Sequence, residues 1–349
     1  MASITVIGGG IFGLSCAWEM TRRGAAVTLI EARGIGAGSS GGTVGALAPH
    51  APENWNDKKQ VQLDALIAAQ DWWADITRIG GTDPGYLRAG RIQPVPDQRT
   101  LDRCADRVRA ARQHWPEWAE MTLTDSPRTP LICDSPTGVW LHDTLTARLS
   151  PRAAGAALAA ALRAAGATII TGQHATPDDI DGPALWATGA AGLHDLSADL
   201  NRPIGNGVKG QSALLHLPGG PDLRNAPQLY ADGLHIVPHA DGGIGIGSTS
   251  ERDFDDGRAT DHLLDDILTR ARALCPLLET AELTDRWAGI RPRAASRAPL
   301  LGPWPGRPGH VVANGGFKIG FGMAPAIAAM IADLMLSDHD RIPAAFRLT

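Results

Sequence analysis

The sequence has 349 residues, of which 44% are hydrophobic and 20% are charged, a composition typical of a globular protein with a large core. With 32 basic and 37 acidic side chains the formal net charge is −5, which indicates neither nucleic acid nor an anionic membrane as a partner. The length favours two domains, and no apolar run is expected to span a bilayer. Because the N-terminus predicts no secretory signal, we expect a cytoplasmic protein.

The four cysteines give no sign of a metal or redox site. They are scattered along the chain without a C-x-x-C pair, which favours buried, reduced thiols. The sequence therefore predicts no metal centre.

The first thirty-one residues carry the strongest pattern. Residues 3–7 predict a buried strand, and a helix and a second strand at 26–30 are predicted after it. Three glycines in the spacing G-x-G-x-x-G separate the first strand from the helix, and an acidic residue ends the second strand. These positions are Gly8, Gly10, Gly13 and Glu31. This order of elements predicts a dinucleotide-binding unit rather than a chance tight turn.

Each of these positions has a physical role in holding a dinucleotide. Gly8 allows a tight turn, Gly10 lets a pyrophosphate approach the backbone, and Gly13 lets the helix pack closely on the strand. The helix, which begins near Ile11, supplies free N–H groups and the positive end of its dipole. Glu31 can accept the ribose hydroxyls and disfavours a 2′-phosphate, so we expect FAD or NAD rather than NADP.

A glycine-rich loop at 32–49 follows, with Ser39 and Ser40 inside it. Its main-chain N–H groups and small hydroxyls can close around a ligand, and a flexible surface loop is the alternative interpretation. A similar succession of strand, glycine-rich turn and helix returns at 311–336. We expect this second turn to meet the first across one sheet.

The remaining helices and strands are predicted from the spacing of apolar residues and from the glycine, proline and polar residues that end each segment. Ser150 and Pro151 have the residue types of a helix N-cap and first helical position. Helices are predicted at 60–79, 101–121, 153–165, 260–278 and 324–336. Strands are predicted at 90–95, 139–142, 167–171, 184–188, 208–217, 233–238, 243–249, 283–290 and 311–313, and the strand at 167–171 is expected to be buried.

The succession of elements predicts an α/β fold with two domains. Alternating strands and helices indicate a Rossmann-like dinucleotide-binding domain made of residues 1–79, 150–205 and 292–349. Strands separated by short turns indicate a second, mainly antiparallel β-sheet domain, made of residues 80–149 and 206–291.

Seven motifs in this order resemble the D-amino acid oxidase superfamily, most closely its glycine oxidase and sarcosine oxidase branch. They are Gly8 to Gly13 with Glu31, Gly45-Ala46-Leu47-Ala48-Pro49, Trp186-Ala187-Thr188-Gly189, Val208-Lys209-Gly210-Gln211, His235-Ile236-Val237-Pro238, Trp287-Ala288-Gly289-Ile290-Arg291-Pro292 and Gly316-Phe317-Lys318-Ile319-Gly320. The resemblance covers almost the whole chain.

The resemblance implies a noncovalent FAD and the oxidation of glycine, sarcosine or a small D-amino acid. It implies hydride transfer to the flavin N5, giving an imine that water hydrolyses. Cys275 lies on a predicted helix away from the C-terminal motifs, so no covalent flavin link is expected. The residues expected at the cofactor are Gly8, Gly10, Ile11, Gly13, Glu31, Ser39, Ser40, Gly45, Ala46, Leu47, Ala175, Thr188, Gly189, Gly316, Phe317, Lys318, Ile319 and Gly320.

Three residues are expected at the reaction centre. The resemblance implies that Arg291 binds the substrate carboxylate, and a guanidinium matches a carboxylate bidentately; a structural salt bridge is the alternative. Lys318 can stabilise negative charge on the reduced flavin, or it faces solvent. His235 stands where relatives often have tyrosine, so it either donates to the substrate carboxylate or is a core histidine. Lys209 is expected to support its strand rather than contact flavin.

Two other functions stay open at this point. An NAD-linked dehydrogenase could share only the first motif, and a noncatalytic flavoprotein subunit is suggested by the altered His235 position. A homo-oligomer is compatible with the sequence, and the electron acceptor is not specified by it.

Overall fold

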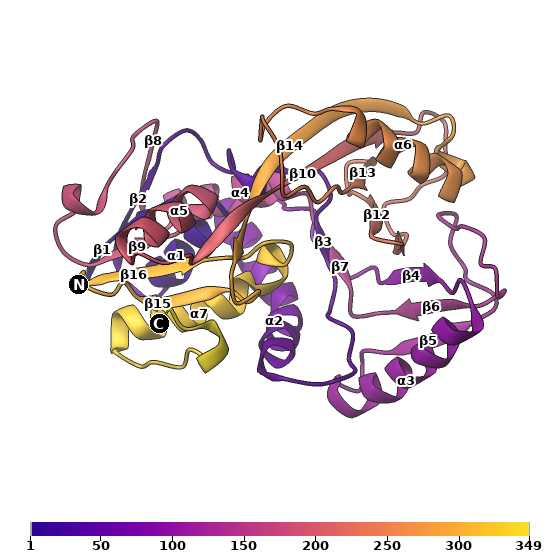
Figure 1. Ribbon diagram of the computed structural model, residues 1–349, viewed down its shortest axis with the longest axis horizontal. Coiled ribbons are helices and arrows are strands. Elements are labelled where there is room, and N and C mark those ends of the chain that lie inside the picture. The colour runs from indigo at the N-terminus through magenta and orange to yellow at the C-terminus, as the bar shows by residue number, and fades with distance from the viewer. Residues whose placement is uncertain (1, 349) are drawn as a thin grey trace.

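The computed structural model describes residues 2–348, and two large sheets lie side by side in it (Figure 1). The first sheet has the strand order β15-β16-β9-β1-β2-β8, in which only the β15/β16 pair is antiparallel. Its strands are β1 (Ser3–Ile7), β2 (Ala26–Glu31), β8 (Thr168–Thr171), β9 (Ala184–Trp186), β15 (Leu300–Pro303) and β16 (His310–Asn314).

Helices cover both faces of this parallel sheet. Helices α1 (Ile11–Arg22), α2 (Asp57–Gly80), α4 (Pro151–Ala164) and α7 (Gly320–Ser337) pack together and share the largest apolar core. Helix α5 (Gly189–Asp199) packs on the other face, where Leu193 and Leu196 join Trp186 in a smaller core. Helices on both faces are typical of a doubly wound α/β sheet.

The second sheet has the order β14-β10-β13-β12-β11-β4-β6-β5, and only its β11/β4 pair is parallel. Its strands are β4 (Arg91–Pro94), β5 (Met121–Thr124), β6 (Trp140–Asp143), β10 (Gly205–His216), β11 (Gln228–Ala231), β12 (Leu234–Pro238), β13 (Gly243–Gly247) and β14 (Glu282–Ala294). Helix α6 (His262–Leu274) covers one face of it with Leu264, Ile267 and Leu268, and α3 (Gln98–His114) packs beside β5. The long strands β10 and β14 run from the first sheet toward α6 (Figure 1).

Short elements complete the described chain. The pair β3 (Ala46–Leu47) and β7 (Ala147–Arg148) is antiparallel. The 3-10 helices are η1 (Ser39–Gly41), η2 (Pro177–Asp179), η3 (Pro276–Leu278) and η4 (Ala344–Phe346).

Two sequence predictions need correction, and some elements were not predicted. The helix predicted over 101–121 ends at His114, because Trp115 precedes a proline and is extended, and Met121 begins β5 instead. The strand predicted to be buried at 167–171 is β8, an edge strand whose two end residues are exposed. Elements α5, β5, β11 and β15 were not predicted.

The expectation that no apolar run could span a bilayer also needs correction. Helix α7 has 18 residues with a mean hydropathy of 1.5, which is enough by length and composition. In this structure α7 packs against α1 and α2, and Met323, Ile327 and Ile331 are fully buried between them. A buried core helix of a globular protein meets the same criterion of length and hydropathy. The hydropathy of α7 is therefore weak evidence for a membrane span.

Candidate active site

A cavity of about 1090 Å³ is lined by residues of both sheets. Its size is that of a site for a large organic ligand. Every predicted site residue except Gly13 lines it, including Ala175, Arg291 and His235, which are far apart in the sequence. The fold therefore brings the two glycine turns and the expected reaction centre into one continuous space.

The first glycine turn has the geometry expected of its spacing. Gly8 has φ +110°, and a Cβ there would lie 2.4 Å from the carbonyl oxygen of Ala187. A Cβ at Gly13 would lie 1.9 Å from the carbonyl oxygen of Gly8, so Gly13 serves packing of α1 on the turn and not the cavity lining. Glu31 lines the cavity and accepts the N–H of Gly9 at 2.7 Å, which ties the end of β2 to the turn.

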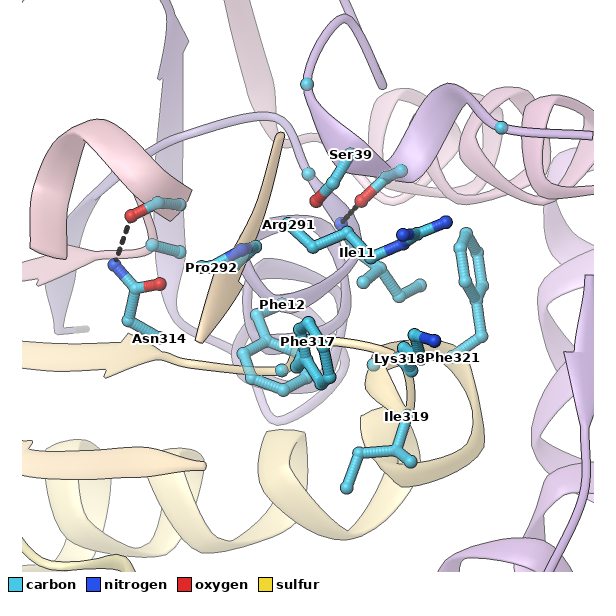
Figure 2. A pocket seen from close by; sticks show the side chains of 18 of the residues that line it. Ile11, Phe12, Ser39, Arg291, Pro292, Asn314, Phe317, Lys318, Ile319 and Phe321 are labelled. Atoms are coloured by element: carbon cyan, nitrogen blue, oxygen red, sulfur yellow. Dashed lines mark hydrogen bonds between the residues drawn. The ribbon is translucent and has the colours of Figure 1, made fainter. Parts of the chain in front are cut away.

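The glycine-rich loop after β2 closes over the start of α1. The Ser40 hydroxyl accepts the N–H of Ile11 at 3.0 Å, and Ser39 lies beside it on η1 (Figure 2). Gly45 has φ +67°, and a Cβ there would lie 1.8 Å from the carbonyl oxygen of Leu149, so the loop passes tightly against the chain before α4. The loop therefore contacts both the start of α1 and the chain before α4, and its role around a ligand stays a prediction.

Three helices begin at the cavity without a cap from their own N-cap side chain, although the Ser40 hydroxyl accepts the first N–H of α1. Helices α1, α5 and α7 start at Ile11, Gly189 and Gly320, all of which line the cavity. The other helices are capped by their own side chains, namely Asn56, Asp97, Ser150 and Asp261. Uncapped N-termini leave N–H groups and positive dipole ends for an anionic ligand such as a pyrophosphate.

The second glycine turn is attached to the first sheet by Asn314. Its side-chain amide donates to the carbonyl oxygen of Gly189 at 2.9 Å (Figure 2). The Phe317 N–H donates to the carbonyl oxygen of Pro292 at 3.0 Å, with Phe317 at φ +41°. These bonds fix the turn between the end of β14 and the start of α7.

Arg291 lies on β14, is only 8% exposed, and lines the cavity. Its Nη1 donates to the carbonyl oxygen of Thr249 at 3.1 Å, and it forms no ion pair with any residue between 2 and 348. Burial lowers the pKa of Arg291 to about 10, which still leaves the guanidinium charged at neutral pH. A structural salt bridge, the alternative for Arg291, is therefore not found.

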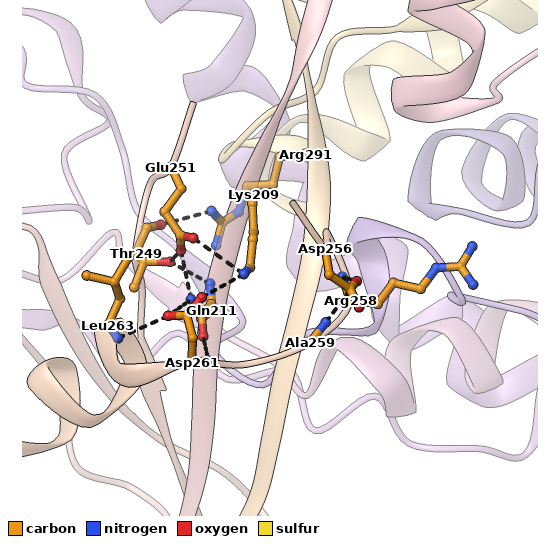
Figure 3. Close-up of polar contacts among 10 residues, drawn as sticks. All are labelled: Lys209, Gln211, Thr249, Glu251, Asp256, Arg258, Ala259, Asp261, Leu263 and Arg291. Atoms are coloured by element: carbon orange, nitrogen blue, oxygen red, sulfur yellow. Dashed lines mark hydrogen bonds and ion pairs between the residues drawn. The ribbon is translucent and has the colours of Figure 1, made fainter. Parts of the chain in front are cut away.

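A polar network lies behind Arg291 and occupies the nearby carboxylates (Figure 3). Lys209 Nζ lies 2.9 Å from Asp261 Oδ2 and 3.5 Å from Glu251 Oε2. The Gln211 amide donates to both carboxylates, at 2.7 Å to Asp261 and 3.0 Å to Glu251. Lys209 lies outside the cavity lining, in agreement with the expectation that it supports its strand.

Lys318 lies on the turn before α7, and its side chain is exposed to the cavity on the same side as Arg291 (Figure 2). Its Nζ lies 5.7 Å from the centre of the Phe317 ring, and no acidic partner is found for it among the described residues. The surrounding protein and the nearby Arg291 charge lower the pKa of Lys318. Lys318 is exposed at the wall of the cavity, and its role at the flavin stays a prediction.

His235 lines the cavity from β12, and its buried Nδ1 has no hydrogen-bond partner in the described chain. Burial lowers its pKa to about 3, and the charges of Arg91 and Lys318 contribute in the same direction. The ring is therefore neutral near pH 7. It packs on Tyr230, with ring centroids 4.6 Å apart.

Several lining residues were missed from the sequence. Arg91 and Tyr230 line the cavity because β4, β11 and β12 are neighbours in the second sheet, which no local pattern shows. Trp287 lines it within a motif that was quoted, and a Cβ at Gly42 would lie 3.4 Å from its ring. Among residues 2–348 no group of three or more His, Cys, Asp or Glu side chains could hold a metal ion.

The geometry and the comparisons with known proteins agree on the class. The sequence model of the DAO family, described as FAD dependent oxidoreductase, matches residues 3–334. This chain belongs to that family and is an FAD-dependent oxidoreductase. The resemblance stated from the motifs is thereby confirmed, as is the fold class of a Rossmann-like FAD-binding sheet with a second, mainly antiparallel sheet.

Individual relatives cover nearly the whole chain. The putative thiamine biosynthesis oxidoreductase ThiO of Rhizobium etli is 30% identical over 339 residues, which are 96% of this chain and 97% of the relative. A glycine oxidase of Geobacillus kaustophilus is 26% identical over 361 residues, 95% of this chain and 92% of the relative. The crystal structure of glycine oxidase from Geobacillus kaustophilus superposes with a TM-score of 0.87 at 23% identity, covering 100% and 99% of the two chains.

Proposed function

We propose that this enzyme oxidises a small amino acid, such as glycine, sarcosine or a small D-amino acid, to the imino acid with a noncovalently bound FAD. The observation that carries the proposal is the position of Arg291. This buried cation has no carboxylate partner among the described residues, and it lines the same cavity as the two glycine turns. The names of the relatives in Rhizobium etli and Geobacillus kaustophilus support it.

The cavity has the features that an extended FAD requires. Three uncapped helix N-termini and the Glu31 carboxylate lie where phosphates and a ribose would be bound. The proposed cofactor residues are those expected from the sequence, with Gly13 acting through packing. The four cysteines are buried and none of them lines the cavity, which supports a dissociable flavin.

The protein residues contribute orientation and electrostatics. Bound FAD supplies the hydride acceptor at its N5. Arg291 holds the substrate carboxylate with two N–H groups, which fixes the α-carbon relative to the cofactor site. Neutral His235 can hydrogen-bond the same carboxylate through its free Nδ1. The charges of Arg291 and Lys318 disfavour an ammonium group nearby, so they favour the neutral amine form of the substrate, whose nitrogen lone pair forms the C=N bond as the α-carbon loses a hydride.

An anaerobic reduction series tests this function. Purified protein should be yellow, and at least one small amino acid should bleach the flavin without oxygen. Admission of air afterwards tests whether oxygen is the electron acceptor. If no amine in a broad panel bleaches the flavin, the noncatalytic subunit is favoured instead, and co-purifying partners would support that outcome. The NAD-linked alternative is not supported, because the family match covers residues 3–334.

The domain division also belongs to this proposal. The parallel sheet draws its strands from 3–31, 168–186 and 300–314, and the antiparallel sheet draws its strands from 91–143 and 205–294. We therefore retain an FAD-binding domain of 1–79, 150–205 and 292–349 and a substrate domain of 80–149 and 206–291. We expect the enzyme to act in the cytoplasm.

A further inference from the structure

One face of the antiparallel sheet presents polar side chains to the cavity. Arg91 and Gln93 on β4, Tyr230 on β11 and His235 on β12 all line it. The register explains this grouping, because Gln228 pairs with Arg91 on the neighbouring strand and Tyr230 pairs with His235. The alternate residues Ile92, Leu229 and Ile236 belong to the apolar core on the opposite face.

Arg91 is held rigidly from one side. It is 9% exposed, and its Nε donates to Asp143 Oδ2 at 3.0 Å. Asp143 is fully buried, lies opposite Arg91 in the strand register, and accepts the Thr146 N–H through Oδ1 at 2.8 Å. The Arg91 guanidinium carbon lies 5.7 Å from the centre of the Tyr230 ring. Asp143 and Tyr230 therefore fix the plane and the direction of the guanidinium.

The other end of Arg91 is available to a ligand. Neither of its terminal nitrogens has a hydrogen-bond acceptor within residues 2–348, although the side chain lines the cavity. Such N–H groups at a nearly buried position are costly unless a ligand or water accepts from them. A guanidinium with two parallel free N–H groups matches a carboxylate better than any neutral group.

The charges in the cavity also indicate more than one anionic group. Arg291 and Lys318 have no acidic partner in the described chain, and His235, whose pKa is lowered by burial and by the charges of Arg91 and Lys318, is neutral. One substrate carboxylate at Arg291 would leave the free end of Arg91 unused, because glycine and sarcosine carry no second anionic group. Met121 and Leu141 line the same wall and could contact a short methylene chain between two carboxylates.

We propose that Arg91 forms a second anion-binding site and that the substrate is an amino acid with a second carboxylate. The α-carboxylate binds Arg291, and the distal carboxylate binds the terminal nitrogens of Arg91. This inference rests on the proposed function and deepens it by naming the substrate class.

The test is the rate of anaerobic flavin reduction by acidic substrates and their neutral counterparts. D-aspartate, D-glutamate and glycine with a carboxymethyl group on its nitrogen are compared with D-asparagine, D-glutamine, glycine and sarcosine. At least one acidic substrate should reduce the flavin about tenfold faster, or more, than its amide or unsubstituted counterpart at equal concentration. One charge-assisted bidentate contact can account for a difference of this size. Arg91→Gln should abolish this acid preference, a reduction of about tenfold, and Arg91→Lys should reduce it less.

Matched variants keep the outcome interpretable. Arg270→Gln removes an arginine that also contacts an aspartate, Asp232, but lies on α6 outside the cavity, and it should keep the acid preference. Because Arg91→Gln leaves Asp143 buried without its partner, Arg91→Gln/Asp143→Asn removes both charges, and FAD content reports folding.

The possible outcomes separate the two proposals. Reduction by neutral amino acids without an acid preference, or an equal loss for acids and amides in Arg91→Gln, would overturn the second site and leave the proposed function intact. Absence of reduction by every compound would overturn the proposed function and this inference with it.

Discussion

Gly210 decides where the Arg291 guanidinium can lie. A Cβ at this position on β10 would lie 1.7 Å from Arg291 Nη1 and 2.0 Å from its Cζ. Because Arg291 is buried, its side chain cannot move aside without losing the position in which it faces the cavity. A residue without contact to the substrate thus controls the anchor for the carboxylate.

We therefore predict that Gly210→Ala keeps FAD but loses substrate binding. A displacement of about 1 Å at an anchoring group can lower the rate of reduction about 100-fold. Anaerobic stopped-flow reduction and binding of an unreactive carboxylate measure this effect. Gly34→Ala is the control, since no heavy atom lies within 4 Å of its added Cβ. Unchanged carboxylate binding in Gly210→Ala would contradict the role given to Arg291.

His235 makes stability depend on pH in a defined direction. Its pKa is lowered to about 3 in the folded protein, so the unfolded chain binds a proton more readily between about pH 6.5 and pH 3. The stabilisation from the neutral ring is complete above pH 6.5 and is lost as the pH falls. We predict that the free energy of unfolding falls by up to about 1.4 kcal/mol per pH unit in this window from His235 alone.

Comparison with His235→Gln isolates this contribution. Other histidines with lowered pKa values, His50, His239 and His310, remain in both proteins and cancel in the difference. Denaturant unfolding of both proteins from pH 7 to pH 4 should show a shallower slope for the variant. Identical slopes would mean that His235 is not a buried neutral ring.

At the scale of elements, the Asn314 amide joins the second glycine turn to the start of α5. It is 2% exposed, donates to the carbonyl oxygen of Gly189, and accepts the N–H of Gly315 at 2.8 Å. It therefore connects the end of β16 to the uncapped start of α5. We predict that Asn314→Ala weakens FAD binding about tenfold, because two buried hydrogen bonds are lost: the Gly189 carbonyl loses its donor and the Gly315 N–H loses its acceptor.

Flavin fluorescence titration of the apoprotein measures this affinity. Asn206→Ala is the matched control, because Asn206 is exposed on β10. An Asn314→Ala protein with the affinity of the wild type would show that the link between the second glycine turn and α5 does not contribute to cofactor binding.

The elements also show how far local sequence carries a prediction. Strand β1, the glycine turn and α1 were predicted because spacing, burial and capping all act within about twenty residues. The end of α3 was missed although Pro116 marks it, since the apolar pattern continues past the proline into β5. Short strands such as β11 and β15 carry too few residues for a periodic signal.

Site residues could likewise be predicted only where the signal lies within a short stretch of sequence. Arg291 and Lys318 were predicted because they lie in contiguous motifs, whereas Arg91 and Tyr230 were not assigned. Their position depends on the parallel pairing of β11 with β4, strands that are separated by more than a hundred residues in the sequence. Only the folded sheet shows that these side chains share a cavity with His235.

At the scale of the whole molecule, one cavity is lined by residues of both sheets, so cofactor binding and global stability should be coupled. We predict that saturating FAD raises the melting temperature of the apoprotein. The free energy of unfolding should increase by about 2.7 kcal/mol when the free FAD concentration is 100 times its Kd. Differential scanning fluorimetry against FAD concentration measures this. A melting temperature that does not depend on FAD would argue against FAD binding in this cavity.

The same preparation tests the noncovalent attachment. All four cysteines are buried and lie outside the cavity lining, so heat or acid denaturation should release all flavin through a small-pore filter. Yellow colour retained on the polypeptide would contradict a dissociable cofactor.

The most direct measurement is a crystal structure of the protein with FAD and an unreactive amino acid analogue. The account predicts the pyrophosphate at the start of α1, the isoalloxazine ring beside the 316–320 turn, and the analogue carboxylate on Arg291. Density for FAD away from both glycine turns, or a carboxylate bound far from Arg291, would contradict it.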